Sequence, residues 1–158
     1  MKIELRKLRI ATGLSQETTA YSAEIWINGE RAFLASNHGT GGCDLYHPVG
    51  RYTVQEVDHW LVANRSPTTY DGIELPADLE TEVATLMDRI AAGKRLKRLL
   101  RTSVVAIRDD DVVSWPLKGR DPTRLKAALL VRYPALAILE SPDTETFDRA
   151  VTLILADR

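Results

Sequence analysis

The chain has 158 residues and a net charge of −1, with 44% hydrophobic and 27% charged residues. This composition is typical of a globular protein and excludes a chain-wide electrostatic attraction to nucleic acid or anionic lipid. A lone cysteine excludes an internal disulfide, and the amino terminus has neither a signal peptide nor a membrane-spanning run. We therefore expect a single domain, residues 1–158, that is cytoplasmic and does not associate with membranes.

Two β-rich segments open the chain. Residues 2–10 predict a strand, and the apolar alternation changes phase near Arg6-Lys7, which indicates a bulge or bend there. Residues 19–36 predict a hairpin closed by Asn28-Gly29, a pair that tolerates the positive φ angles of a type I′ turn.

A regular register from this turn assigns the hairpin side chains to two faces. The predicted core face carries Tyr21, Ala23, Ile25, Ala32 and Leu34. Trp26 and Phe33 lie on the other face. One interpretation is that a later element covers both rings. The alternative is that they anchor a partner protein, a role in which tryptophan is enriched.

Helical signals follow. Thr53 and Glu56 have the spacing of a capping box and indicate a helix over residues 51–64. Residues 65–75, which include Asp71-Gly72, are predicted to form a loop. Pro76 then opens a long helix over about residues 77–101.

The last third of the chain predicts a second hairpin and two more helices. Its expected elements are strands over 104–108 and 112–115, a helix from Asp121-Pro122 to about 131, a strand over 135–139, and a helix over 142–156 that begins at Ser141-Pro142-Asp143. The predicted fold class is α+β. It has an antiparallel sheet of the N-terminal strands and the Asn-Gly hairpin, helices packed mainly on one face, a second small hairpin and a C-terminal helix.

Residues 36–50 form a glycine-rich loop with four of the nine glycines. Asn37, Gly39, Gly41 and Gly42 are its shaping residues, and consecutive free amides of this kind can cradle a phosphate. However, the lysine of a Walker A loop is missing. A turn that needs positive φ angles is the simpler explanation.

The same loop holds Cys43 and His47, which are the candidate metal ligands. With His38 and His59 they supply the nitrogen and sulfur donors that zinc prefers. Their spacing, H-x4-C-x3-H-x11-H, matches no standard zinc motif, so the pattern favours a protein without a cofactor, with zinc as the alternative. A thiol-dependent enzyme centred on Cys43 is a related alternative, although no complete catalytic set accompanies it.

The end of the long predicted helix is strongly cationic. At 100° per residue its cations share one face, opposite Leu96, Leu99 and Leu100, and these cations are Lys94, Lys97, Arg98 and Arg101. Cations at a helix end also complement the helix dipole, so a solvated face is one interpretation. The others are contact with an acidic partner protein and contact with nucleic-acid phosphates. Few aromatic residues lie nearby to stack on bases, which weakens the nucleic-acid interpretation.

Several segments together resemble a family of uncharacterised small proteins encoded by bacteriophages and prophages. They are residues 1–5, Glu17-Thr18, the Asn28-Gly29 hairpin, Ala35-Ser36-Asn37-His38-Gly39-Thr40-Gly41-Gly42-Cys43, His47-Pro48 and residues 96–105. The loop of that family often has the sequence Ser-Asn-Asp-Gly-His-Gly-Gly. His38 stands in place of its Asp and Thr40 in place of its His, which argues against a metal or catalytic role for His38.

The resemblance implies a phage or prophage accessory protein that works in the cytoplasm of a bacterial host. We expect a non-enzymatic protein, with no catalytic residues, that binds a host protein or complex. Inhibition of a bacterial defence system such as CRISPR is one form of this function. The alternatives are the metal-binding or thiol enzyme and a nucleic-acid-binding protein that uses the basic helix end. The sequence leaves the oligomeric state open.

Overall fold

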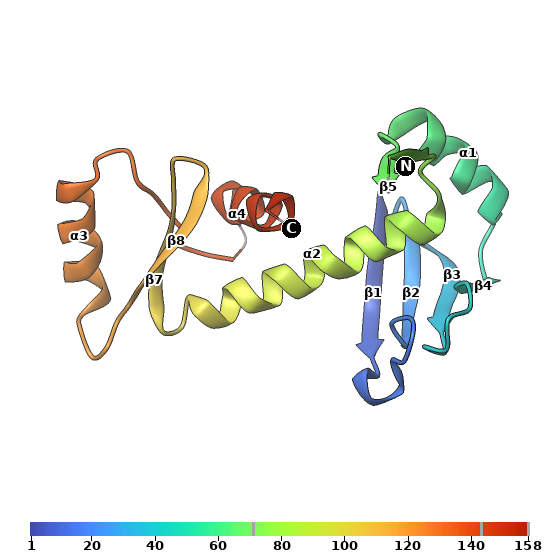
Figure 1. Ribbon diagram of the computed structural model, residues 1–158, viewed down its shortest axis with the longest axis horizontal. Helices are drawn as coiled ribbons and strands as arrows, with labels where there is room; N and C mark the ends of the chain where they lie inside the picture. The colour runs from blue at the N-terminus through green and yellow to red at the C-terminus, as the bar shows by residue number, and fades with distance from the viewer. Residues whose placement is uncertain (71, 143, 158) are drawn as a thin grey trace. The chain divides into compact units, whose positions relative to one another are not determined.

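The computed structural model describes residues 1–70, 72–142 and 144–157. These residues form an α+β fold with an antiparallel N-terminal sheet, a second hairpin and a C-terminal helix, so the predicted fold class is confirmed (Figure 1). The contacts divide the chain into two compact units, residues 1–87 and 88–158. The single-domain assignment stays a prediction.

A four-stranded antiparallel sheet forms the centre of unit 1. Its strands follow chain order: β1 (Ile3–Ile10), β2 (Tyr21–Ile27), β3 (Glu30–Asn37) and β4 (Leu45–Pro48). A one-turn 3₁₀ helix, η1 (Thr12–Leu14), precedes β2. The predicted bulge in β1 is confirmed, because the register with β2 shifts between Arg6 and Arg9 and Lys7 has φ +53°. Strand β4 lies within the segment predicted as a loop.

The β2–β3 hairpin is closed by Asn28 and Gly29, which have φ angles of +52° and +84° as a type I′ turn requires. The predicted register holds for the first two pairs, Ile27 with Glu30 and Trp26 with Arg31. Beyond them Ile25 pairs with Phe33, so β3 contains one extra residue, Ala32. The predicted regular register is therefore wrong past the turn.

This bulge exchanges the faces of two β3 side chains. Phe33, predicted to lie outside the core face, is fully buried, whereas Leu34, predicted in the core, is 42% exposed. Gly50 lies against the bulge, where a Cβ would come within 2.5 Å of the Arg31 carbonyl oxygen. The bulge therefore sets which side of β3 faces the core.

Two helices complete unit 1. Helix α1 (Val54–Asn64) has the predicted capping box between Thr53 and Glu56. Residues 65–75 do not form the predicted loop throughout, because β5 (Thr68–Tyr70) pairs with β6 (Ile73–Leu75). Asp71 of the predicted turn lies outside the described residues.

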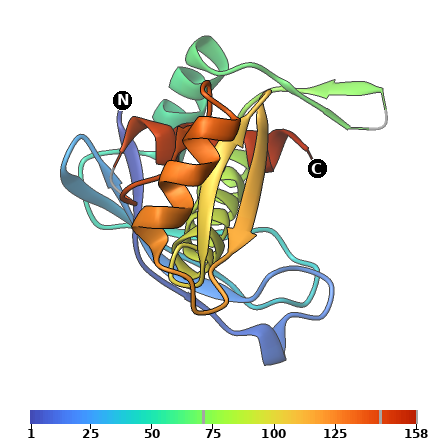
Figure 2. The same ribbon diagram turned by 90° about the vertical axis from the view of Figure 1, so that its left-hand side faces the viewer.

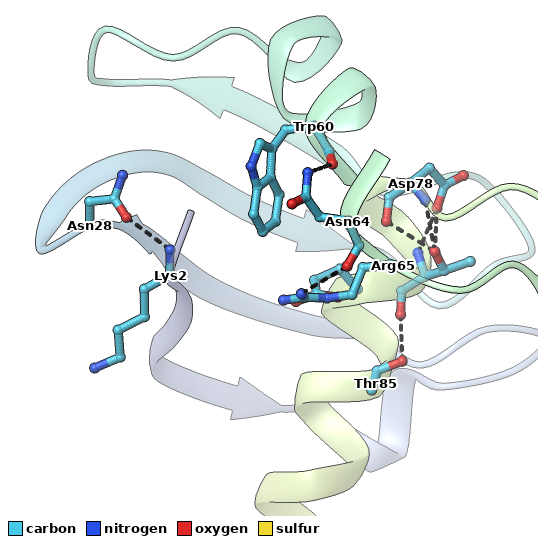
Figure 3. Close-up of polar contacts among 9 residues, drawn as sticks. Lys2, Asn28, Trp60, Asn64, Arg65, Asp78 and Thr85 are labelled. Carbon is cyan, nitrogen blue, oxygen red and sulfur yellow. Dashed lines mark hydrogen bonds and ion pairs between the residues drawn. The ribbon is translucent and has the colours of Figure 1, made fainter. Parts of the chain in front are cut away.

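Helix α2 (Leu79–Leu99) begins in unit 1 and ends in unit 2. Asp78 caps its start by accepting a hydrogen bond from the Thr81 backbone N–H at 2.8 Å (Figure 3). One turn later, the Thr85 hydroxyl donates to the Thr81 carbonyl oxygen. Asp58 of α1 accepts a second hydrogen bond from the Leu79 N–H at 2.7 Å. These acceptors satisfy backbone donors that have no partner inside the helix.

The core of unit 1 lies between one face of the sheet and the two helices. Ile25, Ile27 and Phe33 of the sheet pack in one cluster with Val57 and Leu61 of α1 and with Leu79 and Val83 of α2. The helices therefore cover one face of the sheet, as predicted.

Unit 2 is built on a three-stranded antiparallel sheet. Its elements after α2 are β7 (Ser103–Arg108), β8 (Asp111–Pro116), α3 (Pro122–Arg132), β9 (Ala137–Ile138) and α4 (Glu145–Ala156), and the strand order is β8-β7-β9. The second hairpin and both helices are confirmed. Helix α4 starts later than predicted, because Thr144 and not Ser141 accepts the capping hydrogen bond from Phe147. Asp143 of the predicted start lies outside the described residues.

Helices cover both faces of the second sheet. Val105 and Ile107 of β7 pack with Leu96 of α2 and Phe147 of α4, whereas Val104 and Ala106 pack with Leu129 of α3. Figure 2 shows α3 in front of the two long strands and the end of α4 emerging beyond β8 on the far side. Strand β7 is therefore buried on both faces, which explains why its apolar residues form a continuous run.

Candidate functional site

The cationic residues predicted on the long helix lie at the carboxyl end of α2. All four are exposed: Lys94, Lys97, Arg98 and Arg101. Leu96 is buried beneath them, and Leu99, which was expected on the apolar face, is 36% exposed. Arg101 lies in the turn after the helix, where its N–H donates to the Arg98 carbonyl oxygen.

The structure adds two cations that sequence spacing did not connect to the helix. The N–H of Leu117 donates to the carbonyl oxygen of Thr102 at 2.8 Å, which joins the β8–α3 connection to the turn after α2. Lys118 and Arg120 follow within three residues, and the Arg120 guanidinium donates to the Leu117 carbonyl oxygen. The cationic surface comprises Lys94, Lys97, Arg98, Arg101, Lys118 and Arg120. The predicted end of the second hairpin near residue 115 is close to the observed end of β8 at Pro116, but only the fold shows that the turn after α2 lies next to it.

These six cations have no ion pair with a carboxylate among residues 1–70, 72–142 and 144–157.

The charge of the chain is divided unequally between the two units. Unit 1 has seven Lys and Arg against twelve Asp and Glu, and unit 2 has fourteen against ten, so the net charges are −5 and +4. The neutral total therefore conceals a basic unit with uncompensated charge at one end of its sheet.

The structure separates the two aromatic residues predicted as a partner anchor. Phe33 has no exposed surface to offer a partner. Trp26 is half-buried, and the Arg6 guanidinium covers its ring at 4.0 Å from the centroid. The two rings therefore do not form a shared surface, and intramolecular contacts already occupy Trp26.

Glu24 organises the polar groups around Trp26. Its carboxylate accepts hydrogen bonds from Lys7 at 2.9 Å, from the Trp26 Nε1–H at 3.0 Å and from Arg31 at 3.3 Å. The ammonium of Lys7 and the indole N–H of Trp26 lower the pKa of Glu24 to about 2. This face of the sheet is therefore held together by a network of charged and aromatic groups.

The glycine-rich loop is tied to the start of β2 by Asn37. The buried Asn37 side chain accepts hydrogen bonds from the Gly39 N–H and the Thr18 hydroxyl, both at 2.8 Å, and donates to the Gly42 carbonyl oxygen at 2.9 Å. Gly39 has φ +83°, and a Cβ there would lie 2.4 Å from the Leu14 carbonyl oxygen. The backbone N–H of Gly41 donates to Thr18 at 3.3 Å. Internal partners therefore occupy the Gly39 and Gly41 amides, which argues against a phosphate cradle at these two residues.

Asp44, near the end of this loop, belongs to a cluster of polar side chains that sequence spacing did not indicate. Its carboxylate accepts hydrogen bonds from the phenols of Tyr21 and Tyr46 and from Asn37 at 2.9 Å. Burial and the hydrogen bond to Asp44 raise the pKa of both phenols far above the ordinary value of 10, so they remain neutral donors. Desolvation and the nearby Asp44 carboxylate raise the pKa of Glu80. A pocket of about 440 Å³ opens beside the cluster.

The candidate metal ligands are all on the surface. Cys43, His38, His47 and His59 are exposed. His47 lies in β4 opposite Leu34 and lines a shallow groove of about 530 Å³ on the sheet face away from the helices. Within the described parts of the chain, three or more His, Cys, Asp or Glu side chains are nowhere placed to hold a metal ion.

No family model, curated protein or solved structure matches the chain. In the described residues, no helix has both the length and the apolar character needed to cross a membrane.

Proposed function

We propose that this chain is a non-enzymatic binding protein that uses the cationic surface to bind an acidic face of a partner protein. The observation that carries the proposal is the exposure of six cations without carboxylate partners in a unit of net charge +4. Unpaired cations at an exposed site strengthen association with a complementary acidic surface and accelerate it.

A protein partner fits this surface better than nucleic acid does. Single-stranded nucleic acids are bound by cations interleaved with exposed rings that stack on the bases. Among the described residues, the ring found in contact with one of these six cations is Phe147, whose centroid lies 5.9 Å from the Lys97 Nζ, and it is buried. It therefore cannot stack on a base.

The resemblance to phage and prophage proteins supports a partner in the bacterial cytoplasm. We propose a host protein, and a complex of a bacterial defence system such as CRISPR is the partner to test first. A phage protein gains by blocking such a complex, and an acidic face on one of its subunits would complement the cationic surface.

The test compares the full chain with a triple charge reversal, Lys97→Glu, Arg98→Glu and Arg101→Glu. A matched control reverses three exposed cations of unit 1, Lys2→Glu, Arg9→Glu and Arg51→Glu, with the same change in net charge. Each chain is used to capture proteins from nuclease-treated host lysate, and the captured partner is purified and titrated calorimetrically. We expect the α2 reversal to weaken binding about tenfold or more, or about 1.4 kcal/mol, and the control to change it little.

Two results would contradict the proposal. Equal weakening by both triple variants would mean that only net charge matters. Loss of all capture after nuclease treatment would assign the surface to nucleic acid instead.

A further inference from the structure

Strand β8 is an open edge of the sheet in unit 2, because the strand order is β8-β7-β9. Exposed edges invite pairing with another strand, and proteins usually protect them. The edge strand β1 has a bulge and several cations, β4 has only four residues, and β9 has only two. By contrast, β8 has six residues in regular register with β7 and no Lys or Arg, and its proline, Pro116, stands at its last position.

The register shows which backbone groups of β8 point away from β7. The hydrogen bond from Leu117 to Thr102 marks one hydrogen-bonded pair, and such pairs alternate along an antiparallel ladder. Val112 and Ser114 are therefore at non-hydrogen-bonded positions with respect to β7, so their N–H and C=O groups point outward. Pro116 has the same phase, and its carbonyl oxygen indeed accepts a hydrogen bond from Arg120.

Charge along this edge changes sign from one end to the other. Asp109, Asp110 and Asp111 lie at the hairpin tip, and Lys118 and Arg120 follow the other end of the strand. Arg108 and Arg149 form ion pairs with Asp109 and Asp110, which leaves the tip acidic overall. An antiparallel copy of the same strand would therefore place each acidic tip beside the basic end of its partner.

A groove of about 540 Å³ runs beside β8, and its lining is part acidic and part apolar. The acidic part is Asp110, Asp111 and Asp157. The large apolar side chains are Val112 and Val113 of β8 with Leu153 and Ile154 of α4, and these four are half-buried. Figure 2 shows that α4 continues beyond the β8 edge, so a strand added there would lie over its last turn.

We propose that two copies of this chain form a symmetric dimer by antiparallel pairing of their β8 strands, with Val113 on the two-fold axis. Val112 of one chain then faces Ser114 of the other, and the four outward N–H and C=O groups of each strand edge form hydrogen bonds. The two Val113 side chains meet at a non-hydrogen-bonded position, where cross-strand side chains are closest. The two three-stranded sheets then form a single six-stranded sheet.

A second copy fits this edge because the charge pattern is complementary to itself. In this register Asp110 lies opposite Pro116 of the second chain, beside Lys118 and Arg120 of that chain. The two-fold axis forms this acidic-to-basic contact twice, as a self-complementary interface requires. The proposal rests on the open edge of β8 and not on the partner-binding function above, although the dimer contact would use Lys118 and Arg120 of the cationic surface.

Disulfide trapping tests the register directly. The native Cys43 is first replaced, Cys43→Ser, and Val113→Cys is then introduced in the full chain. Facing Cα atoms at a non-hydrogen-bonded position are about 4.5 Å apart, which a disulfide can span. Ser114→Cys is the matched control, because the two residues 114 lie diagonally at about 7–8 Å and bridge poorly.

Oxidised glutathione should link most of the Val113→Cys chains into dimers and leave most Ser114→Cys chains unlinked. Equal linking of both variants, or preferential linking through residue 114, would overturn the register. Light scattering of the native-cysteine chain, measured over a concentration series, should approach twice the 17.6 kDa mass of one chain. A single-chain mass at every concentration, or a mass that rises only in the presence of a foreign strand peptide, would overturn the dimer.

Ser114→Pro provides a further check because it removes an outward N–H without removing a bond to β7. We expect it to raise the dimer dissociation constant at least about tenfold, whereas Ser114→Thr should leave it within about twofold. Circular dichroism checks that both variants fold. A folded Ser114→Pro variant that remains a dimer would assign the dimer to another surface and overturn the proposal.

Discussion

Lys7 and Glu24 form an ion pair, Nζ to Oε1 2.9 Å, across the bulge of β1. The positive φ of Lys7 marks the backbone irregularity at the position from which its ammonium reaches the carboxylate. Because Glu24 also holds Trp26 and Arg31, the pair links three strands of unit 1. Removal of the carboxylate should therefore affect the stability of the whole sheet.

Glu24→Gln should lower the free energy of unfolding at pH 7 and flatten its dependence on pH. The folded-state pKa of Glu24, about 2, lies below its ordinary value of 4.5. The stabilisation from Glu24 is therefore present above pH 4.5 and is lost as the pH falls toward 2. Urea unfolding at pH 7 and at pH 3 measures both effects, with Glu30→Gln, at the exposed Glu30–Arg51 pair, as the control. An equal loss of stability in both variants would contradict the role of Glu24.

Phe33→Ala should destabilise the chain by about 3–5 kcal/mol, because the ring is fully buried and its removal leaves a cavity. Leu34→Ala, at the 42% exposed neighbour, should cost less than about 1 kcal/mol. Denaturant unfolding of the two variants compares adjacent residues on opposite faces. A regular hairpin register would reverse their order.

Asn37→Ala should cost about 1–3 kcal/mol, because the buried Gly39 N–H and the Gly42 carbonyl oxygen would lose their side-chain partner. Hydrogen exchange of the Gly39 amide should also be faster in this variant. Asn64→Ala removes one exposed hydrogen bond, to the Trp60 carbonyl oxygen (Figure 3), and should change stability by less than about 0.5 kcal/mol. Similar losses in the two variants would show that Asn37 does not hold the loop.

Tyr21 and Tyr46 should ionise only when the protein unfolds at alkaline pH. Burial raises the pKa of both phenols, and so does the hydrogen bond to Asp44. Their contribution to stability is present below pH 10 and is lost as the pH rises above it. Ultraviolet titration should therefore give less phenolate absorbance for the native chain than for the denatured chain. This difference should be smaller in Tyr46→Phe, and equal absorbance of the native and denatured chains would contradict the prediction.

Local signals predicted the elements well. Asn28-Gly29 fixed the position of the hairpin turn, and Thr53 with Glu56 fixed the start of α1, because both patterns act through neighbouring backbone groups. The face assignment of β3 failed for a local reason, a single extra residue at Ala32. The alternation of side chains between the two faces changes phase at a bulge, so the predicted pattern assigned Phe33 and Leu34 to each other's faces.

The candidate sites were less predictable because they depend on contacts between distant segments. The cations of α2 were found from helical spacing, whereas Lys118 joins them only through the Leu117–Thr102 hydrogen bond. Asp44 meets Tyr21 across 23 residues, and no short spacing encodes that distance. The Cys and His residues are rare types that lie close together in the sequence, but in the fold they are exposed surface groups.

The extra residue at Ala32 has a consequence for the order of events in folding. The type I′ turn involves only neighbouring residues, so it can form early in folding. Once formed, it is compatible with a regular β2–β3 ladder as well as with the bulged one. The bulged register is favoured by contacts beyond the turn, namely the burial of Phe33 against α1 and α2 and the hydrogen bonds from the Val49 and Gly50 N–H groups to the Ala32 carbonyl oxygen. We therefore expect the hairpin to close in competing registers until the helices dock, so that the slipped form acts as a kinetic trap that the core resolves.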